Sequence, residues 1–255
     1  MDGSGPLETL DDFAVALATG ALSYHVQPIW DVAANAPIGV ELLLRSRQGG
    51  RFEAVPQVLI AEAARLYGAD MGPSVRIASE AASTFVNRDR TLFASFNTTQ
   101  GFLEHDAGEG TVWLEQLTGG MPPGRLVFEI VETAEIASIG RTRHLLEALR
   151  RAGHRIALDD FGAGYSDLRR LAALPLDILK LDRVLVQRSL EDPAAMASIR
   201  DAVALAGERG IDVIAEGVET EAQSRAMSSE GIDLQQGYLH GRPDRPEVWA
   251  ARLLG

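Results

Sequence analysis

Short apolar segments recur along the chain, and most are followed by a polar tip and then by a stretch with helical periodicity. Continuous apolar runs of this length, several of them bounded by Gly or Pro, are typical of strands buried on both faces. The segments that fit this description are 23–30, 38–44, 91–96, 125–131, 155–158, 178–181, 211–215 and a weaker one around 233–239.

Helical patterns fall between most of these segments, at 56–67, 74–85, 142–152, 193–209 and 219–229. In the third of them Leu145, Leu146 and Leu149 share one face, and Gly153 follows as a C-terminal stop. Strands that alternate with helices predict a mainly parallel sheet. Because there are eight strand candidates, an α/β fold of the (β/α)8 TIM-like barrel type is favoured over an open sheet. A barrel of about 250 residues would occupy the whole chain of 255.

Composition excludes several classes of protein. The absence of cysteine excludes disulfides and zinc–thiolate sites and fits a cytoplasmic protein. A net charge of −12 argues against DNA binding, and no apolar run approaches the ~18 residues of a membrane span. The first residues lack the features of a signal peptide. We therefore expect a flexible lead-in over 1–10 and one barrel domain over 11–255.

Charged and amide side chains stand at or near the ends of the predicted strands. They are Glu41, Asn97, Glu129, Asp159, Asp160, Lys180 and Glu216. Active sites of barrel enzymes gather at the C-terminal ends of the strands, so these residues are expected to meet. Carboxylate and amide oxygens are hard ligands that suit Mg²⁺ or Mn²⁺, and adjacent acids can serve two ions. The plainer reading of the acidic composition is solubility alone.

A series of short motifs occurs in a fixed order along the chain. They are Gln27-Pro28-Ile29, Glu41-Leu42-Leu43-Leu44-Arg45, Asn97-Thr98-Thr99, Glu129-Ile130-Val131-Glu132, Asp159-Asp160-Phe161-Gly162-Ala163-Gly164-Tyr165-Ser166, Leu179-Lys180-Leu181-Asp182, Ala215-Glu216-Gly217-Val218-Glu219-Thr220 and Gln236-Gly237-Tyr238-Leu239. In this order they resemble the EAL family of bacterial cyclic di-GMP phosphodiesterases, from about Tyr24 to Pro243.

The resemblance implies a barrel with an antiparallel first strand that hydrolyses one phosphodiester of cyclic di-GMP to linear pGpG. It also implies two divalent ions, Mg²⁺ or Mn²⁺. One ion would be bound by Glu41, Asn97, Glu129 and Asp159, and the second by Asp159, Asp160 and Glu216. The catalytic residues that it implies are Lys180, Glu41, Asp160 and Glu132.

Further roles follow from the same resemblance. Lys180 would orient or deprotonate the attacking water, and Glu132 would anchor a mobile loop over 160–166. Arg45 would grip a phosphate oxygen, to which its planar guanidinium is suited. Supporting or substrate contacts would come from Gln27, Asp182, Glu219 and Gln236. A homodimer is expected from the family, and a longer parent chain would carry an N-terminal sensor or regulatory domain.

Other readings remain open at this stage. Arg45 could be a surface strand-end residue, Glu132 and Glu219 could be helix-start acids, and Lys180 could face solvent. Some EAL-like domains only bind the nucleotide or a protein partner, usually after losing a ligand or the lysine, and none is lost here. A generic metal-dependent barrel enzyme, such as an enolase-like lyase, would not explain the adjacent acids, Lys180 and Gln236 together. Departures from the family pattern, such as Leu42 for Ala and Ala163 for Thr, remove no ligand.

Overall fold

The computed structural model describes residues 7–67, 72–89, 91–98, 124–131, 139–163 and 173–254. The strands are β1 (Leu22–Asp31), β2 (Ala36–Gln48), β3 (Arg51–Ala54), β4 (Phe93–Thr98), β5 (Leu126–Val131), β6 (Arg155–Phe161), β7 (Ile178–Leu181), β8 (Asp212–Ala215) and β9 (Leu234–Gln236). The helices are α1 (Leu10–Thr19), α2 (Gln57–Tyr67), α3 (Gly72–Val86), α6 (Ile139–Arg151), α8 (Arg183–Arg188), α9 (Pro193–Arg209), α10 (Glu221–Ser229) and α11 (Pro246–Leu253).

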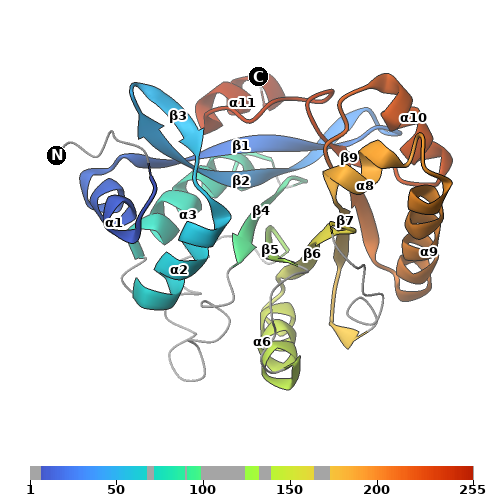
Figure 1. The fold of residues 1–255 in the computed structure, drawn as a ribbon, viewed down its shortest axis with the longest axis horizontal. Coiled ribbons are helices and arrows are strands. Elements are labelled where there is room, and N and C mark those ends of the chain that lie inside the picture. The colour runs from blue at the N-terminus through green and yellow to red at the C-terminus, as the bar shows by residue number, and fades with distance from the viewer. Residues whose placement is uncertain are drawn as a thin grey trace.

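The strands close into a barrel. In the described residues the order is β1-β9-β8-β7-β6-β5-β4-β2, and β1 returns to pair with β2. From β2 through β4 to β9 each neighbour is parallel, whereas β1 is antiparallel to both β2 and β9. Figure 1 shows the helices arranged around these strands, with α2 and α3 on one side and α9 and α10 on the other. The predicted (β/α)8 barrel with an antiparallel first strand is confirmed.

The helices around the barrel begin and end where the local sequence dictates. Asp192 caps the N-terminus of α9 by accepting a hydrogen bond from the backbone N–H of Ala194, and Gly210 ends it in the left-handed conformation. Thr220 and Gln223 form a reciprocal capping box at the start of α10. Apolar faces of the helices pack on the outside of the strands, where Phe85, Leu146 and Ile199 are completely buried.

Two layers of side chains fill the barrel interior, because alternate residues of a strand point to the same face. The layer farther from the barrel mouth is apolar and consists of Ile29, Phe93, Val127, Ala157, Ile178 and Ile214. Gly39 makes room for this layer, since a Cβ there would lie 2.8 Å from the Phe93 ring. Two residues further toward the barrel mouth, the same strands or their ends carry Gln27, Glu41, Ser95, Glu129, Asp159, Lys180 and Glu216. The apolar layer therefore forms a dry floor beneath a polar layer.

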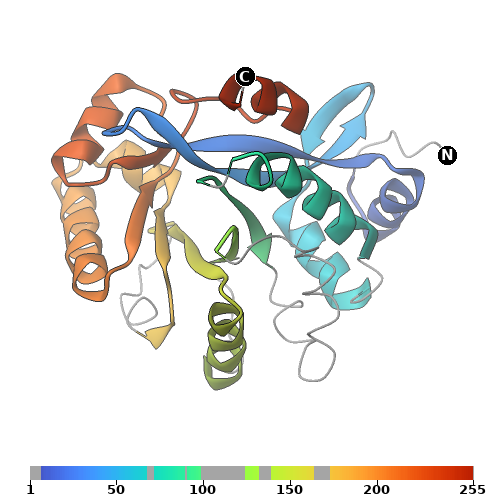
Figure 2. The same ribbon diagram turned by 180° about the vertical axis from the view of Figure 1, so that it is seen from behind.

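Strand β2 extends past the rest of the barrel. Its pairing with β4 stops at Leu42, but it continues to Gln48, paired with β1 on one edge and with β3 on the other. Gly49 and Gly50 connect β2 to β3 with positive φ angles of 55° and 82°, as a tight two-residue hairpin requires. Both ribbon views show the β2–β3 hairpin standing off the barrel near α1 (Figures 1 and 2).

A second hydrophobic core supports this extension. Phe13 of α1, Leu22 of β1, Leu44 of β2 and Leu59 of α2 are among its buried members, and Leu7 joins them. Full burial of an aliphatic side chain stabilises a fold by about 1.5–3 kcal/mol, so the extension is a packed part of the structure. The predicted boundary of the lead-in at residue 10 stays a prediction.

Every predicted strand and helix has a counterpart in the structure, with bounds that differ by a few residues. Four elements within the described ranges were not predicted: α1, β3, α8 and α11. All are short, and β3 is exposed along its whole length, so none produces a long apolar periodicity. None of the helices in the described ranges combines the length and hydropathy needed to cross a bilayer.

Candidate active site

The side chain of Lys180 lies at the centre of the polar layer. Its Nζ atom is 2.6 Å from Oε1 of Glu216, 2.9 Å from Oε1 of Glu129 and 3.3 Å from Oδ1 of Asp159. Oε2 of Glu41 lies 3.6 Å away. Lys180 is 1% exposed, so the reading that it faces solvent is wrong. Side chains from β2, β5, β6 and β7, and from the end of β8, thus converge at one end of the barrel, as predicted.

Amide side chains hold Glu41 in place from both sides. Asn97 donates from Nδ2 to Oε1 of Glu41 at 3.3 Å, and Gln236 donates from Nε2 to Oε2. Gln236 also reaches Oε1 of Gln27, whose own Nε2 donates to the carbonyl of Gly241 at 2.9 Å. Because Gln27 stands directly opposite Glu41 in the antiparallel β1–β2 pair, their side chains share one face. Gln27 and Gln236 are therefore part of the site.

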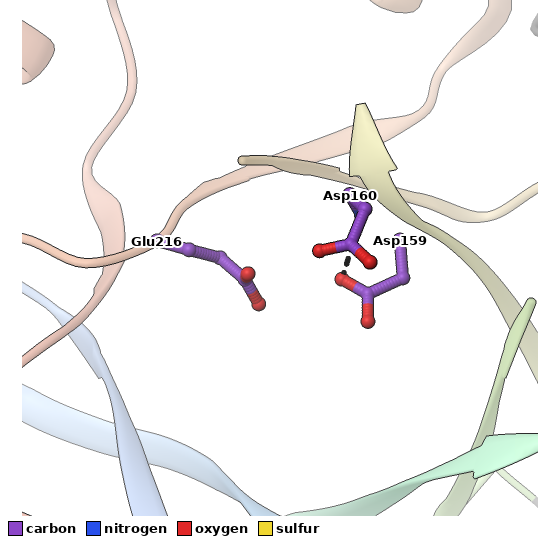
Figure 3. A group of neighbouring side chains, drawn as sticks. All are labelled: Asp159, Asp160 and Glu216. Carbon is purple, nitrogen blue, oxygen red and sulfur yellow. Dashed lines mark hydrogen bonds between the residues drawn. The ribbon is translucent and has the colours of Figure 1, made fainter. Parts of the chain in front are cut away.

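Asp159 and Asp160 both contribute to the site although they are adjacent in a strand. Adjacent residues normally point to opposite faces, but β6 contains a bulge between Leu158 and Phe161. Asp160 adopts a positive φ of 58°, and its backbone N–H donates to Oδ1 of Asp159 at 2.9 Å. Figure 3 shows the two carboxylates next to each other and facing Glu216. One oxygen from each of the three residues lies within 4.8 Å of the others.

Burial and the crowding of charged groups shift the pKa values of several side chains in the site. Burial raises the pKa of Glu129 to about 8, against the opposing effect of Lys180. Burial also raises the pKa of Glu216 well above its usual range. The pKa of Asp160 is raised to about 6 by burial and by the charges of Asp159 and Asp182. Burial alone would lower the pKa of Lys180, but the surrounding carboxylates together raise it well above its ordinary value. Four carboxylates, those of Glu41, Glu129, Asp159 and Glu216, thus surround the single lysine.

The donor atoms of the site fit divalent cations. Both carboxylate oxygens of Glu129 and Oδ1 of Asn97 are buried without a hydrogen bond of good geometry. Nζ of Lys180 lacks one too, so its contacts with the carboxylates are ion pairs with poor hydrogen-bond angles. Unsatisfied buried polar atoms are costly, and they are expected where an ion completes their bonding. Carboxylate and amide oxygens are the ligands of Mg²⁺ and Mn²⁺.

Other predicted residues lie outside this cluster. Arg45 is half-buried on the same face of β2 as Glu41, and its Nη1 donates to the carbonyl of Leu44 at 3.0 Å. Asp182 caps α8 by accepting a hydrogen bond from Val184. Glu219 is exposed and lies 3.2 Å from Arg183. Glu132 lies outside the described residues, as do residues 164–166 of the loop predicted over 160–166.

Ser95 is a member of the polar layer that the sequence prediction missed. It is 1% exposed and stands beside Glu41 in the β2–β4 register. Its hydroxyl lowers the pKa of Glu129, in opposition to burial, although Oγ of Ser95 makes no hydrogen bond of good geometry. Its position two residues before Asn97 on the same strand was the available signal, since alternate residues share a face.

The fold and the site define a parallel-rich (β/α)8 barrel with a carboxylate–lysine cluster at its mouth. The model of the EAL domain family matches residues 10–243, and the chain therefore belongs to that family. The Cyclic di-GMP phosphodiesterase RocR of Pseudomonas aeruginosa is 42% identical over 123 residues, which are 48% of this chain and 31% of RocR. The chain thus matches about a third of the length of that relative.

Solved structures share the whole architecture. The PaMucR phosphodiesterase, solved as a c-di-GMP complex, aligns with a TM-score of 0.82 and 28% identity over 95% of this chain and all of the other. Klebsiella pneumoniae BlrP1, solved as a manganese/cy-diGMP complex, aligns with a TM-score of 0.76 and 30% identity. That alignment covers 89% of this chain and 56% of BlrP1.

Proposed function

We propose that this domain is a metal-dependent phosphodiesterase that hydrolyses cyclic di-GMP to linear pGpG. The observation that carries the proposal is the cluster of four carboxylates around Lys180, beside a fifth from Asp160, with buried donor oxygens left unsatisfied. Membership of the EAL domain family supports it. So does the similarity to RocR, a cyclic di-GMP phosphodiesterase, and to PaMucR and BlrP1, which were solved as complexes with the cyclic dinucleotide.

The donor set divides into two groups that could each hold one cation. Glu41, Asn97 and Glu129 contribute oxygens from β2, β4 and β5, while Asp160 and Glu216 contribute from the opposite side. Asp159 lies between the groups, because it contacts Lys180 and also the Asp160–Glu216 pair. A pair of divalent ions would supply Lewis-acid activation of the water and of the scissile phosphate. Mg²⁺ and Mn²⁺ both suit these oxygens.

Lys180 is proposed to orient the attacking water and to stabilise negative charge that develops on the phosphate. In the metal-free site the surrounding carboxylates raise its pKa well above the ordinary value, against the effect of burial. Arg45, on the same face as Glu41, is placed to contact a phosphate oxygen. The apolar floor beneath the site excludes water from below.

The alternative of a non-hydrolysing receptor is not favoured, because every predicted ligand within the described residues lies at the site. Asp182 and Glu219 have structural partners of their own, so substrate contacts from them stay predictions. The loop-anchoring role of Glu132, the homodimer and the N-terminal regulatory domain also stay predictions.

Chromatography of cyclic di-GMP incubated with the purified domain tests the proposal. The reaction is run with Mn²⁺, with Mg²⁺ and with EDTA, and cyclic di-AMP is supplied as a second substrate. Formation of pGpG with either ion, with none in EDTA and a much slower reaction of cyclic di-AMP, is the expected result. If cyclic di-GMP binds but stays intact with both ions, the receptor alternative replaces the phosphodiesterase.

A further inference from the structure

The inner face of the β2–β3 extension continues the surface of the site outward. Paired residues of antiparallel strands share a face, so Gln27, Glu41 and Arg45 mark one face of β1 and β2. Following the register outward places His25 of β1 on that face, then Arg47 of β2 and its partner Phe52 of β3. The site at the metal ligands is therefore continuous with a wall that stands above it.

This wall, defined by His25, Arg45, Arg47 and Phe52, is held from behind. The opposite face carries Leu22 and Leu44, which are buried against α1 and α2 in the second hydrophobic core. The inner face is left uncovered at its outer end, where Arg47 is exposed and Phe52 is 39% exposed. A surface that is packed rigidly on one face and open to solvent on the other is suited to binding a ligand.

The β2–β3 hairpin curls toward β1 on this face, so that Phe52 of β3 contacts His25 of β1. The rings of His25 and Phe52 lie with centroids 5.1 Å apart, although β2 lies between β1 and β3 in pairing order. His25 has a buried Nε2 atom without a hydrogen-bond partner. Burial and the charge of Arg45 lower the pKa of His25, so the ring is neutral at neutral pH. The result is an uncharged aromatic pair with one exposed ring.

Charge is segregated between the two faces of the extension. From Leu43 outward, the inner-face positions carry Arg45 and Arg47 and no carboxylate, whereas Glu53 lies on the outer face. None of the ion pairs in the described ranges involves Arg47. A strand rises about 3.3 Å per residue, so Arg45 and Arg47 are about 7 Å apart along β2. In a chain with net charge −12, this face suits an anion with more than one phosphate.

We propose that the wall binds the half of the cyclic dinucleotide that is not being cleaved. The exposed ring of Phe52, backed by His25, stacks on a guanine base, and Arg47 contacts the second phosphate while Arg45 contacts the first. This inference rests on the proposed function, because it names how the same site holds its substrate. Base stacking on an aromatic ring and a phosphate–arginine contact each contribute to affinity without taking part in bond cleavage.

The test compares cyclic di-GMP with bis(p-nitrophenyl) phosphate, a phosphodiester without bases or a second phosphate. Phe52→Ala and Arg47→Gln are assayed with Mn²⁺, beside Arg51→Gln as the control. Arg51 is an exposed arginine of the same hairpin whose side chain lies on the outer face. The ratio of kcat/KM for cyclic di-GMP over the simple diester falls about tenfold in both wall variants, mainly through KM, and stays constant in the control.

An equal loss on both substrates, or no loss on either, overturns the wall as a nucleotide subsite. If the wild-type domain cleaves the simple diester but leaves cyclic di-GMP intact, the proposed function fails instead. The same variants are then compared by calorimetric titration with cyclic di-GMP. Weaker binding by Phe52→Ala and Arg47→Gln than by Arg51→Gln would support the wall as a nucleotide subsite, and equal binding would refute it.

Discussion

Nζ of Lys180 lies 2.9 Å from Oε1 of Glu129, and each side chain is 1% exposed. Removing one member of a buried ion pair leaves its partner unpaired and costs about 3–5 kcal/mol. Lys180→Met should therefore lower the free energy of unfolding of the metal-free protein by about 3 kcal/mol. Excess Mn²⁺ should restore much of this loss, because cations neutralise the same carboxylates. Urea denaturation with EDTA and with Mn²⁺ measures both effects.

Arg200→Met is the matched control for this experiment, since it removes an exposed cation that pairs with Glu230 on the surface. Its effect should be much smaller and independent of Mn²⁺. Equal stabilisation of Lys180→Met and Arg200→Met by Mn²⁺ would show that the cation does not bind among the carboxylates that surround Lys180.

Much of this site was predictable from the sequence, because Glu41, Glu129 and Lys180 sit within or at the ends of apolar runs that had to be strands. Period-two alternation and barrel closure then bring such residues together. The bulge that lets Asp159 and Asp160 share a face was not predictable, since it depends on the register with β7. The β2–β3 hairpin was missed because its exposed residues show no apolar pattern. The packing of α1 and α2 that supports the extension is a tertiary feature, which local sequence patterns do not reveal.

The carboxylate of Asp160 should lower the stability of the metal-free protein while contributing to metal binding. Its carboxyl is partly buried, its pKa is raised to about 6, and its positive φ suits asparagine as well as aspartate. Asp160→Asn should therefore raise the Tm of the metal-free protein slightly, by about 1–3 °C. It should also reduce the increase in Tm that Mn²⁺ produces. Scanning calorimetry with and without Mn²⁺ checks both, and an undiminished response to Mn²⁺ would exclude Asp160 as a ligand.

Gly237 should be intolerant of substitution because of a close backbone approach. A Cβ at this position would overlap the backbone carbonyl of Val218, which cannot move as a flexible side chain can. Gly237→Ala should lower the free energy of unfolding by about 2–4 kcal/mol and shift Gln236 away from Glu41. Gly207→Ala in α9, where a Cβ meets nothing within 4 Å, should be neutral or stabilising. Equal denaturation midpoints for the two variants would contradict this packing.

His154 should make stability depend on pH. Burial lowers its pKa, whereas the unfolded chain has a histidine pKa of about 6.5. Near pH 7.5 both states are neutral, so the group has no effect. As pH falls through 6.5, the unfolded state takes up a proton that the folded state does not, and stability decreases until the folded pKa is reached. His25 and His240 act in the same direction.

The contribution of His154 can be isolated with His154→Gln. Between pH 7.5 and 5.5 the urea midpoint of the wild-type protein should fall by more than that of the variant. The comparison is made in EDTA, so that cation binding does not contribute. Parallel curves for the two proteins would mean that His154 is protonated equally in both states.

Glu129→Gln tests the metal site at its most buried carboxylate. The substitution keeps the shape of the side chain but replaces one oxygen that lacks a hydrogen bond. Calorimetric titration should show Mn²⁺ affinity reduced at least tenfold, or about 1.4 kcal/mol. Glu62→Gln, on the exposed face of α2, should bind Mn²⁺ as the wild-type protein does. An unchanged Mn²⁺ affinity in Glu129→Gln would show that the ions bind elsewhere.

The most direct test of the central claim is cyclic di-GMP turnover after metal depletion and restoration, in the wild type and in Glu41→Gln. Glu41 contacts Asn97, Gln236 and Lys180, so it joins the proposed cation ligands to the rest of the site. The wild type should form pGpG after Mn²⁺ is restored, whereas Glu41→Gln should lose at least 99% of that rate, or about 2.7 kcal/mol of transition-state stabilisation. Full turnover by Glu41→Gln, or by the depleted wild type, would contradict a metal-dependent site at this cluster.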